Sequence, residues 1–299
     1  DYILFIKCIM KIAFLFLIIN DINFPDIWEN YFKGYEGKYS VYCHPKNSDQ
    51  VQTRWLRDNI IDNIVETGWG YIVDAYSQLL THAYQNEENI KFITISESCV
   101  PLIPFDDLYN MLTADLDRSY VKYMKISKYD LHERIQVNEG YGKYKFIKHY
   151  ARFCLSRYHV NKLLVQTEGL DFFKNMHIGD EFFLSLLDAE DNIENMAITF
   201  DNWEFVVNER KRYKGKIRRL YEKIEELPNP LSNKGKKIKG QIDTMKQRVD
   251  DFSKNPKTYN HITEYDIIEI IDSGCFFWRK ISKKSNIRNF YRGNTCCLK

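Results

Sequence analysis

Several motifs that often reveal a protein's function are missing from this chain of 299 residues. It has no Gly-rich phosphate loop, no H-E-x-x-H sequence and no nucleophile elbow. Its 43 Lys and Arg residues nearly balance its 41 Asp and Glu residues, which leaves a net charge of +2. Nucleic acids and acidic membranes attract a sustained positive field, so this balance gives no global reason to expect either partner.

Paired cysteines are also missing. The seven cysteines are scattered and contain no C-x-x-C pair, so neither a zinc site nor a disulfide framework is indicated. A reducing compartment follows as the expected environment. Because the residue usage is also rich in Asn, Ile, Lys and Tyr, we expect a cytoplasmic protein of a bacterium, or of a large DNA virus in its host's cytoplasm.

The chain lacks a long uncharged apolar run. Residues 2–19 are apolar, but Lys7 and Lys11 lie inside this stretch, and a spanning helix needs roughly 20 nearly uncharged residues. We therefore predict no integral membrane segment. Residues 11–18 instead fit the buried first strand of an α/β sheet, with Met10 as the expected natural start.

Strand-like and helix-like segments alternate along the rest of the chain. Strands are expected at residues 11–18, 39–43, 92–95, 120–124, 153–155 and 197–200, and helices at residues 27–33, 55–64, 72–85, 106–112, 157–166 and 180–187. A polar, Gly-containing loop is expected at residues 138–143. This alternation predicts a three-layer α/β domain.

Residues 208–253 differ in kind, because they are dense in Lys, Arg and Glu. Their apolar residues recur at spacings of three and four in two runs, which are separated by Pro228-Asn229-Pro230. We predict an antiparallel helical hairpin inserted in the main domain. Its basic face could bind phosphate or membrane, although a charge run is more often a solvated helix surface.

The apolar run at residues 92–95 stops abruptly at Ser96-Glu97-Ser98. Ligands of open α/β sheets gather beyond the carboxyl ends of strands, so these polar residues lie where chemistry is usually done. Ordinary turn chemistry explains them equally well, and the two interpretations stay open.

One pair of carboxylates has the letters of a metal-binding Asp-x-Asp motif. Asp115-Leu116-Asp117 follows a predicted helix and precedes a strand, however, which places it at the edge of the sheet opposite the loop after Ile95. We therefore expect a helix cap and surface role. Without a metal ion, the charge of a departing diphosphate must be met by cations, and Arg279 and Lys280 offer two.

Gly179-Asp180-Glu181 is expected to open a helix. Both carboxylates would then be explained as caps at the helix N-terminus. Glu181 could equally serve as a general base.

Eight short segments together resemble, in order and spacing, the core-2/I-branching glycosyltransferases, which form glycosyltransferase family 14 with related plant enzymes and peptide xylosyltransferases. The segments are KIAFLFLI, WGYIVDAYSQLLTHAY, FITISESCVPL, ARFCLSR, GDEFFLSLL, NWEF, NPKTY and FFWRK. The resemblance covers most of residues 11–282 except the predicted hairpin. It implies a single domain over residues 1–299 with a GT-A fold, in which helices sandwich a Rossmann-like mixed sheet. It also implies an inverting reaction with a UDP-sugar and no divalent metal or other cofactor.

The resemblance also assigns roles to single residues. Glu181 looks like the catalytic base, and Glu97 takes the place where metal-using relatives carry Asp-x-Asp, on the acceptor side. Residues that look like UDP-sugar contacts are Tyr42, Cys43, His44, Asp74, Lys257, Arg279 and Lys280. Trp203 and Phe205 resemble an aromatic pair that lines the acceptor site. The chain departs from the family at His149-Tyr150, where Gly-Ser is usual, and we expect neither the disulfides nor the Golgi anchor of animal members.

The sequence therefore predicts a metal-independent inverting glycosyltransferase that moves a sugar, N-acetylglucosamine first, from UDP to a hydroxyl of a glycan or glycoprotein. Xylose and glucuronic acid are alternative sugars, because the family is divided among these donors. An alternative of another class is a binding protein that kept the fold, lost catalysis and holds a partner through the hairpin. The hairpin could also mediate a homo-oligomer. A nucleic-acid partner is not expected.

Overall fold

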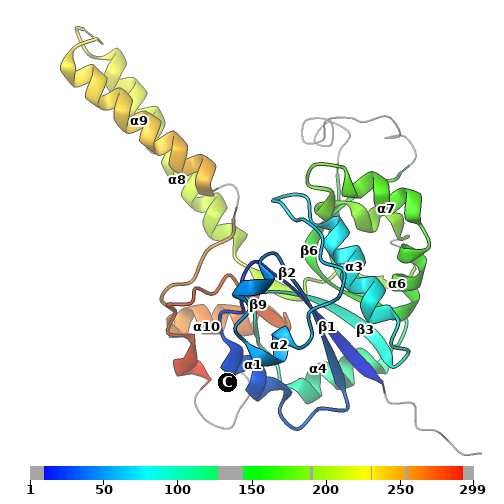
Figure 1. Ribbon diagram of the computed structural model, residues 1–299. Coiled ribbons are helices and arrows are strands. Elements are labelled where there is room, and N and C mark those ends of the chain that lie inside the picture. Colours follow the sequence, from blue (N-terminus) through cyan, green and yellow to red (C-terminus); the bar gives the residue numbers. More distant parts are fainter. Residues whose placement is uncertain (1–9, 127–143, 189–190, 230, 253–254, 292–299) are drawn as a thin grey trace, which may run out of the picture. The chain divides into compact units, whose positions relative to one another are not determined.

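The computed structural model describes residues 10–126, 144–188, 191–229, 231–252 and 255–291 (Figure 1). The loop expected at residues 138–143 lies outside these ranges. The chain divides into two compact units, and each is described by itself. Unit 1 comprises residues 1–200 and 260–299, and unit 2 comprises residues 201–259.

The centre of unit 1 is a six-stranded mixed sheet with the order β2-β1-β3-β6-β5-β7. Strand β1 runs parallel to β2 and β3, whereas β6 runs antiparallel to β3 and β5. The strands are β1 (Lys11–Ile18), β2 (Tyr39–Pro45), β3 (Asn89–Ser96), β5 (Ser119–Lys125), β6 (Ile147–Ser156) and β7 (Ile193–Glu194). A smaller sheet has the order β4-β9-β8, with β4 at Val100–Pro101, β9 at Phe277–Arg279 and β8 at Thr199–Asp201.

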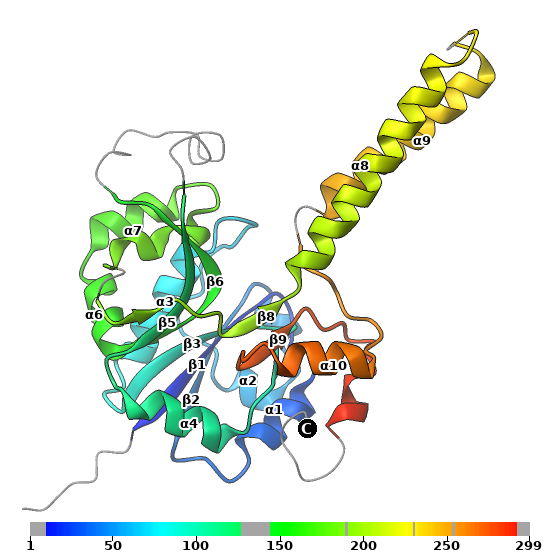
Figure 2. The same cartoon turned by 180° about the vertical axis from the view of Figure 1, so that it is seen from behind.

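Helices cover both faces of the six-stranded sheet (Figures 1 and 2). Alternate residues of β1 show why, because Phe14 packs in one apolar core and Leu15 in another. The first core adds helices α1 (Pro25–Phe32), α2 (Arg54–Arg57) and α4 (Phe105–Ala114), and the second adds α3 (Val73–Tyr84), α6 (Arg157–Leu164) and α7 (Thr167–Lys174). The predicted α/β class, a mixed sheet flanked by helices, is confirmed.

The helix predicted at residues 55–64 is wrong beyond Arg57, where α2 ends. The chain instead pairs with the edge of β2, because Cys43 N–H donates to Asn59 O at 2.8 Å and Ile61 N–H donates to Cys43 O at 3.0 Å. An edge strand offers unpaired backbone groups, and here they take the place of helical hydrogen bonds.

The helix predicted at residues 180–187 is also wrong. Two short 3₁₀ turns, η3 (Gly179–Glu181) and η4 (Phe183–Leu186), occupy this stretch. Its hydrogen bonds go to β6: Leu184 N–H donates to His149 Nε2 at 3.2 Å, and the Ser185 hydroxyl accepts from Ile147 N at 2.9 Å. A helix dipole therefore does not explain the two carboxylates. Helix α7 was not predicted, because its apolar stripe is short.

Other helical segments complete unit 1. They are η1 (Ser48–Gln50), α10 (Glu264–Ile271) and η5 (Ile287–Phe290). No helix within the described ranges is long and apolar enough to cross a membrane.

Unit 2 contains two long helices, α8 (Trp203–Glu225) and α9 (Asn233–Phe252), which lie side by side in both views (Figures 1 and 2). Val206 of α8 and Ile242 and Val249 of α9 are buried. The first helix begins five residues before the predicted start at residue 208, because the Asn202 side chain caps it by accepting from Phe205 N at 2.9 Å.

Candidate functional site

Three parallel strands of unit 1 end together. Leu17 of β1 is in register with His44 of β2 on one side and Ser96 of β3 on the other. Strand β6 runs the opposite way beside β3, with Ile93 opposite Cys154, so its first residues extend past the end of β3. We call this region, the ends of β1, β2 and β3 with the start of β6, the carboxyl edge.

The loop after β3 is tied to the C-terminal part of unit 1. The Glu97 carboxylate accepts from Ile19 N at 2.7 Å, at the end of β1. Ile281 N–H donates to Ser98 O at 3.1 Å, and the Asn23 side chain donates to Ile281 O at 2.7 Å. These bonds bring Lys280, the neighbour of Ile281, to the carboxyl edge beside Glu97.

His44 lies next to Asp74 at the same edge. Burial lowers the pKa of His44, and the nearby Asp74 charge only partly opposes this. Its Nε2 accepts from Val65 N at 3.0 Å, so Nδ1 carries the proton of the neutral ring, and Nδ1 has no hydrogen-bond partner among the described residues. Asp74 pairs with the Lys174 ammonium at 3.3 Å.

The two residues before His44 have structural contacts instead. The Tyr42 hydroxyl accepts from Asn89 at 2.9 Å, and Asn89 begins β3, at the opposite end of the sheet. The Cys43 side chain is fully buried, and burial, followed by the Asp21 charge, raises the pKa of its thiol to about 12. The geometry therefore directs neither side chain toward a ligand at the carboxyl edge.

Two neighbouring carboxyl groups of η3 differ in their surroundings. Glu181 lies 2.9 Å from the Lys148 ammonium of β6, and its side chain is 36% exposed. Asp180 is half-buried, and one of its carboxyl oxygens has no hydrogen-bond partner in the part of the chain that the structure describes. Burial, and then the Glu181 charge, raises the pKa of Asp180 to about 6, against the opposing effect of Arg152.

Tyr76 of α3 lies between the Asp180 carboxyl group and two cations of the carboxyl edge, Arg152 and Arg279. Its buried hydroxyl donates to Ala151 O at 2.8 Å and accepts from the Arg152 guanidinium. Burial raises the pKa of Tyr76, Arg152 and Arg279 lower it, and Asp180 raises it. Arg279 and Asp180 therefore both lie within electrostatic reach of one hydroxyl. Tyr76, Lys148 and Arg152 were not predicted as site residues, although Tyr76 and Arg152 fall within two of the segments that carry the family resemblance.

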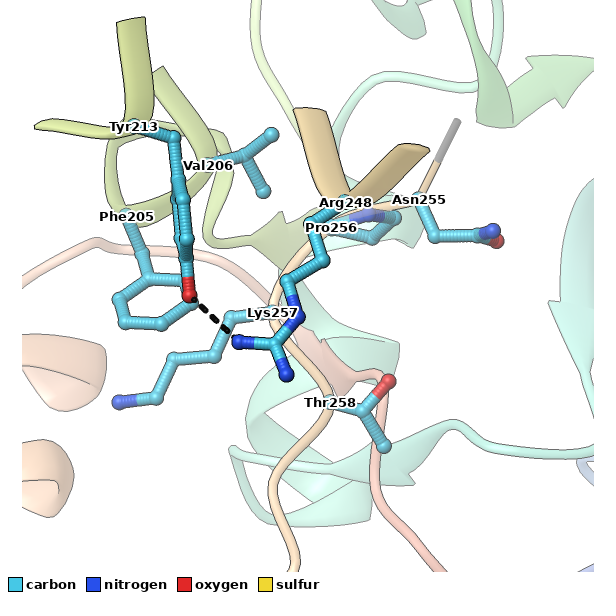
Figure 3. Close-up of a pocket in the computed structure, with 8 residues that line it drawn as sticks. All are labelled: Phe205, Val206, Tyr213, Arg248, Asn255, Pro256, Lys257 and Thr258. Atoms are coloured by element: carbon cyan, nitrogen blue, oxygen red, sulfur yellow. Dashed lines mark hydrogen bonds between the residues drawn. The ribbon is translucent and has the colours of Figure 1, made fainter. Parts of the chain in front are cut away.

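Unit 2 carries a pocket of about 530 Å³ near the start of α8 (Figure 3). It is lined by Phe205, Val206, Tyr213, Arg248, Asn255, Pro256, Lys257 and Thr258, a set with two cations and no carboxylate. The Lys257 ammonium lies 5.6 Å from the centre of the Phe205 ring and 4.3 Å from that of Tyr259. Lys257 N–H also donates to Asn202 O at 3.1 Å, which fixes it beside the cap of α8. Trp203 begins α8 and does not line the pocket.

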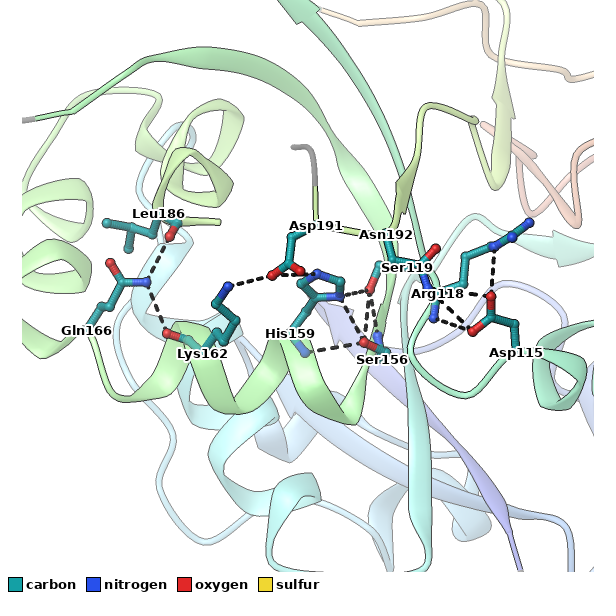
Figure 4. Close-up of polar contacts among 10 residues, drawn as sticks. All are labelled: Asp115, Arg118, Ser119, Ser156, His159, Lys162, Gln166, Leu186, Asp191 and Asn192. Atoms are coloured by element: carbon teal, nitrogen blue, oxygen red, sulfur yellow. Dashed lines mark hydrogen bonds and ion pairs between the residues drawn. The ribbon is translucent and has the colours of Figure 1, made fainter. Parts of the chain in front are cut away.

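At the opposite, amino edge of the sheet, two serines, a histidine and an aspartate resemble a serine–histidine–aspartate arrangement (Figure 4). His159 Nδ1 lies 2.8 Å from the Ser119 hydroxyl and 2.9 Å from that of Ser156, and Nε2 lies 3.9 Å from Asp191. Ser119, Ser156 and His159 are fully buried, and Ser156 also caps α6. A nucleophile must reach its substrate, so this arrangement is structural.

Asp115 lies at this amino edge as well. Its carboxylate accepts from the backbone of Asp117 and of Arg118 at 3.2 Å, and the fully buried Lys91 donates to its carbonyl at 2.8 Å. The predicted cap and surface role of Asp115 at the end of α4 is confirmed. Across the described ranges, no group of three or more His, Cys, Asp or Glu side chains could hold a metal ion.

Comparisons with known proteins indicate one family. The family model described as "Branch: Core-2/I-Branching enzyme" matches residues 12–226. Glycosyltransferase BC10 of rice, Oryza sativa subsp. japonica, is 29% identical over 110 residues, which cover 34% of this chain and 28% of that protein. The chain thus spans little more than a quarter of that relative. The solved structure of M. capricolum TrmK with S-adenosyl-homocysteine aligns over 81% of this chain and 93% of that chain at 11% identity. Its TM-score of 0.16 is too low to indicate a shared fold.

Proposed function

Because the chain belongs to the core-2/I-branching enzyme family and is therefore a glycosyltransferase, we propose that it transfers a sugar from UDP to an acceptor hydroxyl. N-acetylglucosamine is our first choice of sugar, and a glycan or glycoprotein is the acceptor. We also propose a GT-A arrangement, inversion at the transferred carbon and independence from divalent metals. The observation that carries the proposal is the gathering of cations and carboxylates at the carboxyl edge. The cations come from β6 and the end of β9, and the carboxylates come from α3, η3 and the loop after β3.

The uridine would lie against His44 and Asp74. His44 is fully buried and held neutral, so its Nδ1–H can donate to a carbonyl or hydroxyl oxygen of the nucleotide only if the bound nucleotide displaces the side chains that cover it. Asp74 can accept from a uracil N–H or a ribose hydroxyl. It is already paired with Lys174 at 3.3 Å, so donor binding would have to share or displace this ion pair.

The diphosphate would be met by cations in place of a metal ion. Arg279 ends strand β9 and Lys280 follows it directly, and the hydrogen bond from Ile281 N to Ser98 O fixes their backbone at the carboxyl edge. Lys257, the third cation that the resemblance implied, belongs to unit 2 and lies there with Arg248 in a pocket without carboxylates. Preorganised cations stabilise the negative charge that develops on a leaving diphosphate.

Glu181 would act as the base. Its carboxylate takes the proton of the acceptor hydroxyl while the acceptor oxygen bonds to carbon 1 of the sugar and the bond from carbon 1 to the diphosphate breaks. This single displacement inverts the carbon and needs no covalent nucleophile. The ion pair with Lys148 orients the carboxylate, and the side chain is exposed enough to meet an acceptor from solvent.

The same ion pair favours one competing hypothesis. If the Glu181 carboxylate stays paired with Lys148 and cannot accept a proton from an acceptor, the chain is a binding protein that kept the fold without turnover. Transfer of xylose or glucuronic acid is the alternative within the enzyme class.

Release of UDP from a panel of UDP-sugars, measured in EDTA and again with Mn²⁺, tests the proposal. The panel contains the N-acetylglucosamine, xylose and glucuronic acid donors. We expect one donor to be turned over equally in both conditions. Turnover that requires Mn²⁺ would reject the cation assignment. Failure of every donor, with a melting temperature that rises in UDP, would favour the binding protein.

A further inference from the structure

Three solvent-exposed rings gather beside the η3 turn. Trp69 is 65% exposed and Tyr71 46% exposed, and His177 is exposed as well. The centre of the His177 ring lies 5.6 Å from that of Trp69 and 5.4 Å from that of Tyr71. Single exposed aromatic residues are ordinary, but three adjoining rings from two separate segments form a surface that can bind a ligand. We call these three residues the aromatic platform.

The platform is held in place by its backbone. Gly68 and Tyr71 exchange both backbone hydrogen bonds, at 3.3 and 3.1 Å, and close a tight turn around Trp69. Gly70 has a φ of +78°, and a Cβ there would lie only 3.0 Å from the backbone nitrogen of Ile178. The turn therefore packs directly on the segment that carries His177. Rings fixed in this way lose little conformational freedom when they bind.

The segment beneath the platform, residues 178–181, ends at the proposed base, Glu181. Ile178 has a φ of 54°, a left-handed conformation that is unfavourable for a β-branched residue. Gly179 follows, where a Cβ would lie 1.9 Å from the carbonyl oxygen of Phe173, so only glycine fits. Asp180 and Glu181 come next, and Glu181 is four residues beyond His177. Unfavourable backbone geometry that persists in this way often marks a functional segment.

We propose that the aromatic platform binds a sugar ring of the acceptor and presents its neighbouring hydroxyl to Glu181. A pyranose ring has a face of C–H groups, which carry slight positive charge, and the face of an aromatic ring is negative, so the two pack together. Uracil could also stack on Trp69, but one nucleobase needs one ring, whereas three adjoining rings suit consecutive sugars. This inference rests on the proposed function, because it names the substrate that the platform holds.

A glycan array probed with the wild-type chain and three variants tests the platform. We expect Trp69→Ala to weaken binding to the glycans of the wild-type protein about tenfold, and Trp69→Phe to keep part of it. Tyr265→Ala is the matched control, since Tyr265 is 85% exposed and lies on α10. Unchanged binding by Trp69→Ala, or no glycan bound by the wild-type chain, would overturn the proposal.

The shift in melting temperature caused by UDP, measured on the same proteins, separates this test from that of the proposed function. The shift should be equal in wild type and Trp69→Ala, and the melting temperature without UDP confirms that each variant is folded. Loss of the shift in Trp69→Ala alone would overturn the acceptor assignment in favour of uracil stacking. Absence of the shift in the wild-type chain would count against the UDP-sugar proposal, while the array result would still decide the platform.

Discussion

The two edges of the central sheet hold similar residue types in different states. At the amino edge, Ser119, Ser156 and His159 are fully buried and bonded to one another, and the buried Lys91 binds two backbone carbonyls. At the carboxyl edge, Glu181 is partly exposed and Asp180 is half-buried. Buried polar atoms without a hydrogen-bond partner among the described residues occur at both edges, as His159 Nε2 and His44 Nδ1 show, so exposure is what differs. Residue types that are common in catalysis therefore do not locate a functional site by themselves.

The difference follows from the direction of the strands. The amino edge of β3 is closed by the loop after α4, whose carbonyl groups Lys91 caps. At the carboxyl edge, β1, β2 and β3 end and are followed by loops, and in open α/β sheets such loops commonly form the ligand site. Fully buried polar groups cannot reach a ligand from solvent, whereas a partly exposed carboxylate such as Glu181 can.

Matched amide substitutions at the two edges should have the largest and most unequal effects. Glu181→Gln keeps the shape of the side chain but removes the proton acceptor, so kcat should fall by roughly 10² to 10⁴. Asp191→Asn changes a carboxylate of the amino edge that pairs with Lys162, and kcat should stay near that of wild type. Equal and modest losses in both would mean that Glu181 is structural, and Glu97 would be the next candidate.

Acid should weaken the fold through His149. Burial holds the pKa of this histidine at about 4, and both ring nitrogens are bonded in the neutral form, to Tyr150 O and from Leu184 N. The unfolded chain takes up this proton near pH 6.5, so stability is complete above that pH and falls toward pH 4, by about 3 kcal/mol. Urea unfolding at pH 7 and pH 4 measures it. His149→Gln should flatten this dependence, and an unchanged slope would contradict it.

At the amino edge, Lys91→Met should cost stability but not chemistry. The ammonium group of Lys91 donates to the carbonyls of Asp115 and Arg118, and its loss leaves both buried acceptors unsatisfied. We expect the free energy of unfolding to fall by about 1–3 kcal/mol. The kcat per folded molecule should not change, and a large fall in kcat would show that the two edges are coupled.

Asp180 should have the smallest effect, with the opposite dependence on pH. The folded chain ionises this carboxyl near pH 6 and the unfolded chain near 3.8, so stability falls as pH rises through this window. Asp180→Asn should therefore be more stable than wild type at pH 8, by about 1 kcal/mol after allowance for solvent screening. The difference in unfolding free energy between the variant and wild type should shrink toward pH 4. Urea unfolding at both pH values measures it, and a difference that does not change with pH would contradict this cause.

The sequence predicted the framework of the fold well. Apolar runs such as residues 11–18 and helical spacing such as residues 72–85 are local signals, and β1 and α3 formed there. The helix predictions for residues 58–64 and 180–187 failed because the hydrogen bonds of these residues go to partners distant in sequence, β2 and β6. Competition of that kind is invisible in a local pattern.

The candidate site was only partly predictable for a similar reason. The abrupt end of β3 at Ser96 located the carboxyl edge correctly. The sequence indicated only a helix cap at Asp180, yet burial and the Glu181 charge together raise the pKa of its carboxyl to about 6. Tyr76, which connects Arg152 to Asp180 and Arg279, looked like an ordinary apolar position of a helix. Electrostatic coupling depends on distances that spacing does not give.

A crystal structure of the chain with UDP, grown in EDTA, would test the central claim most directly. We predict that the uridine lies against His44 and Asp74 and that the diphosphate contacts Lys280, with Glu181 open to the acceptor side. UDP bound at the amino edge, or bound to no residue of the carboxyl edge, would contradict the account.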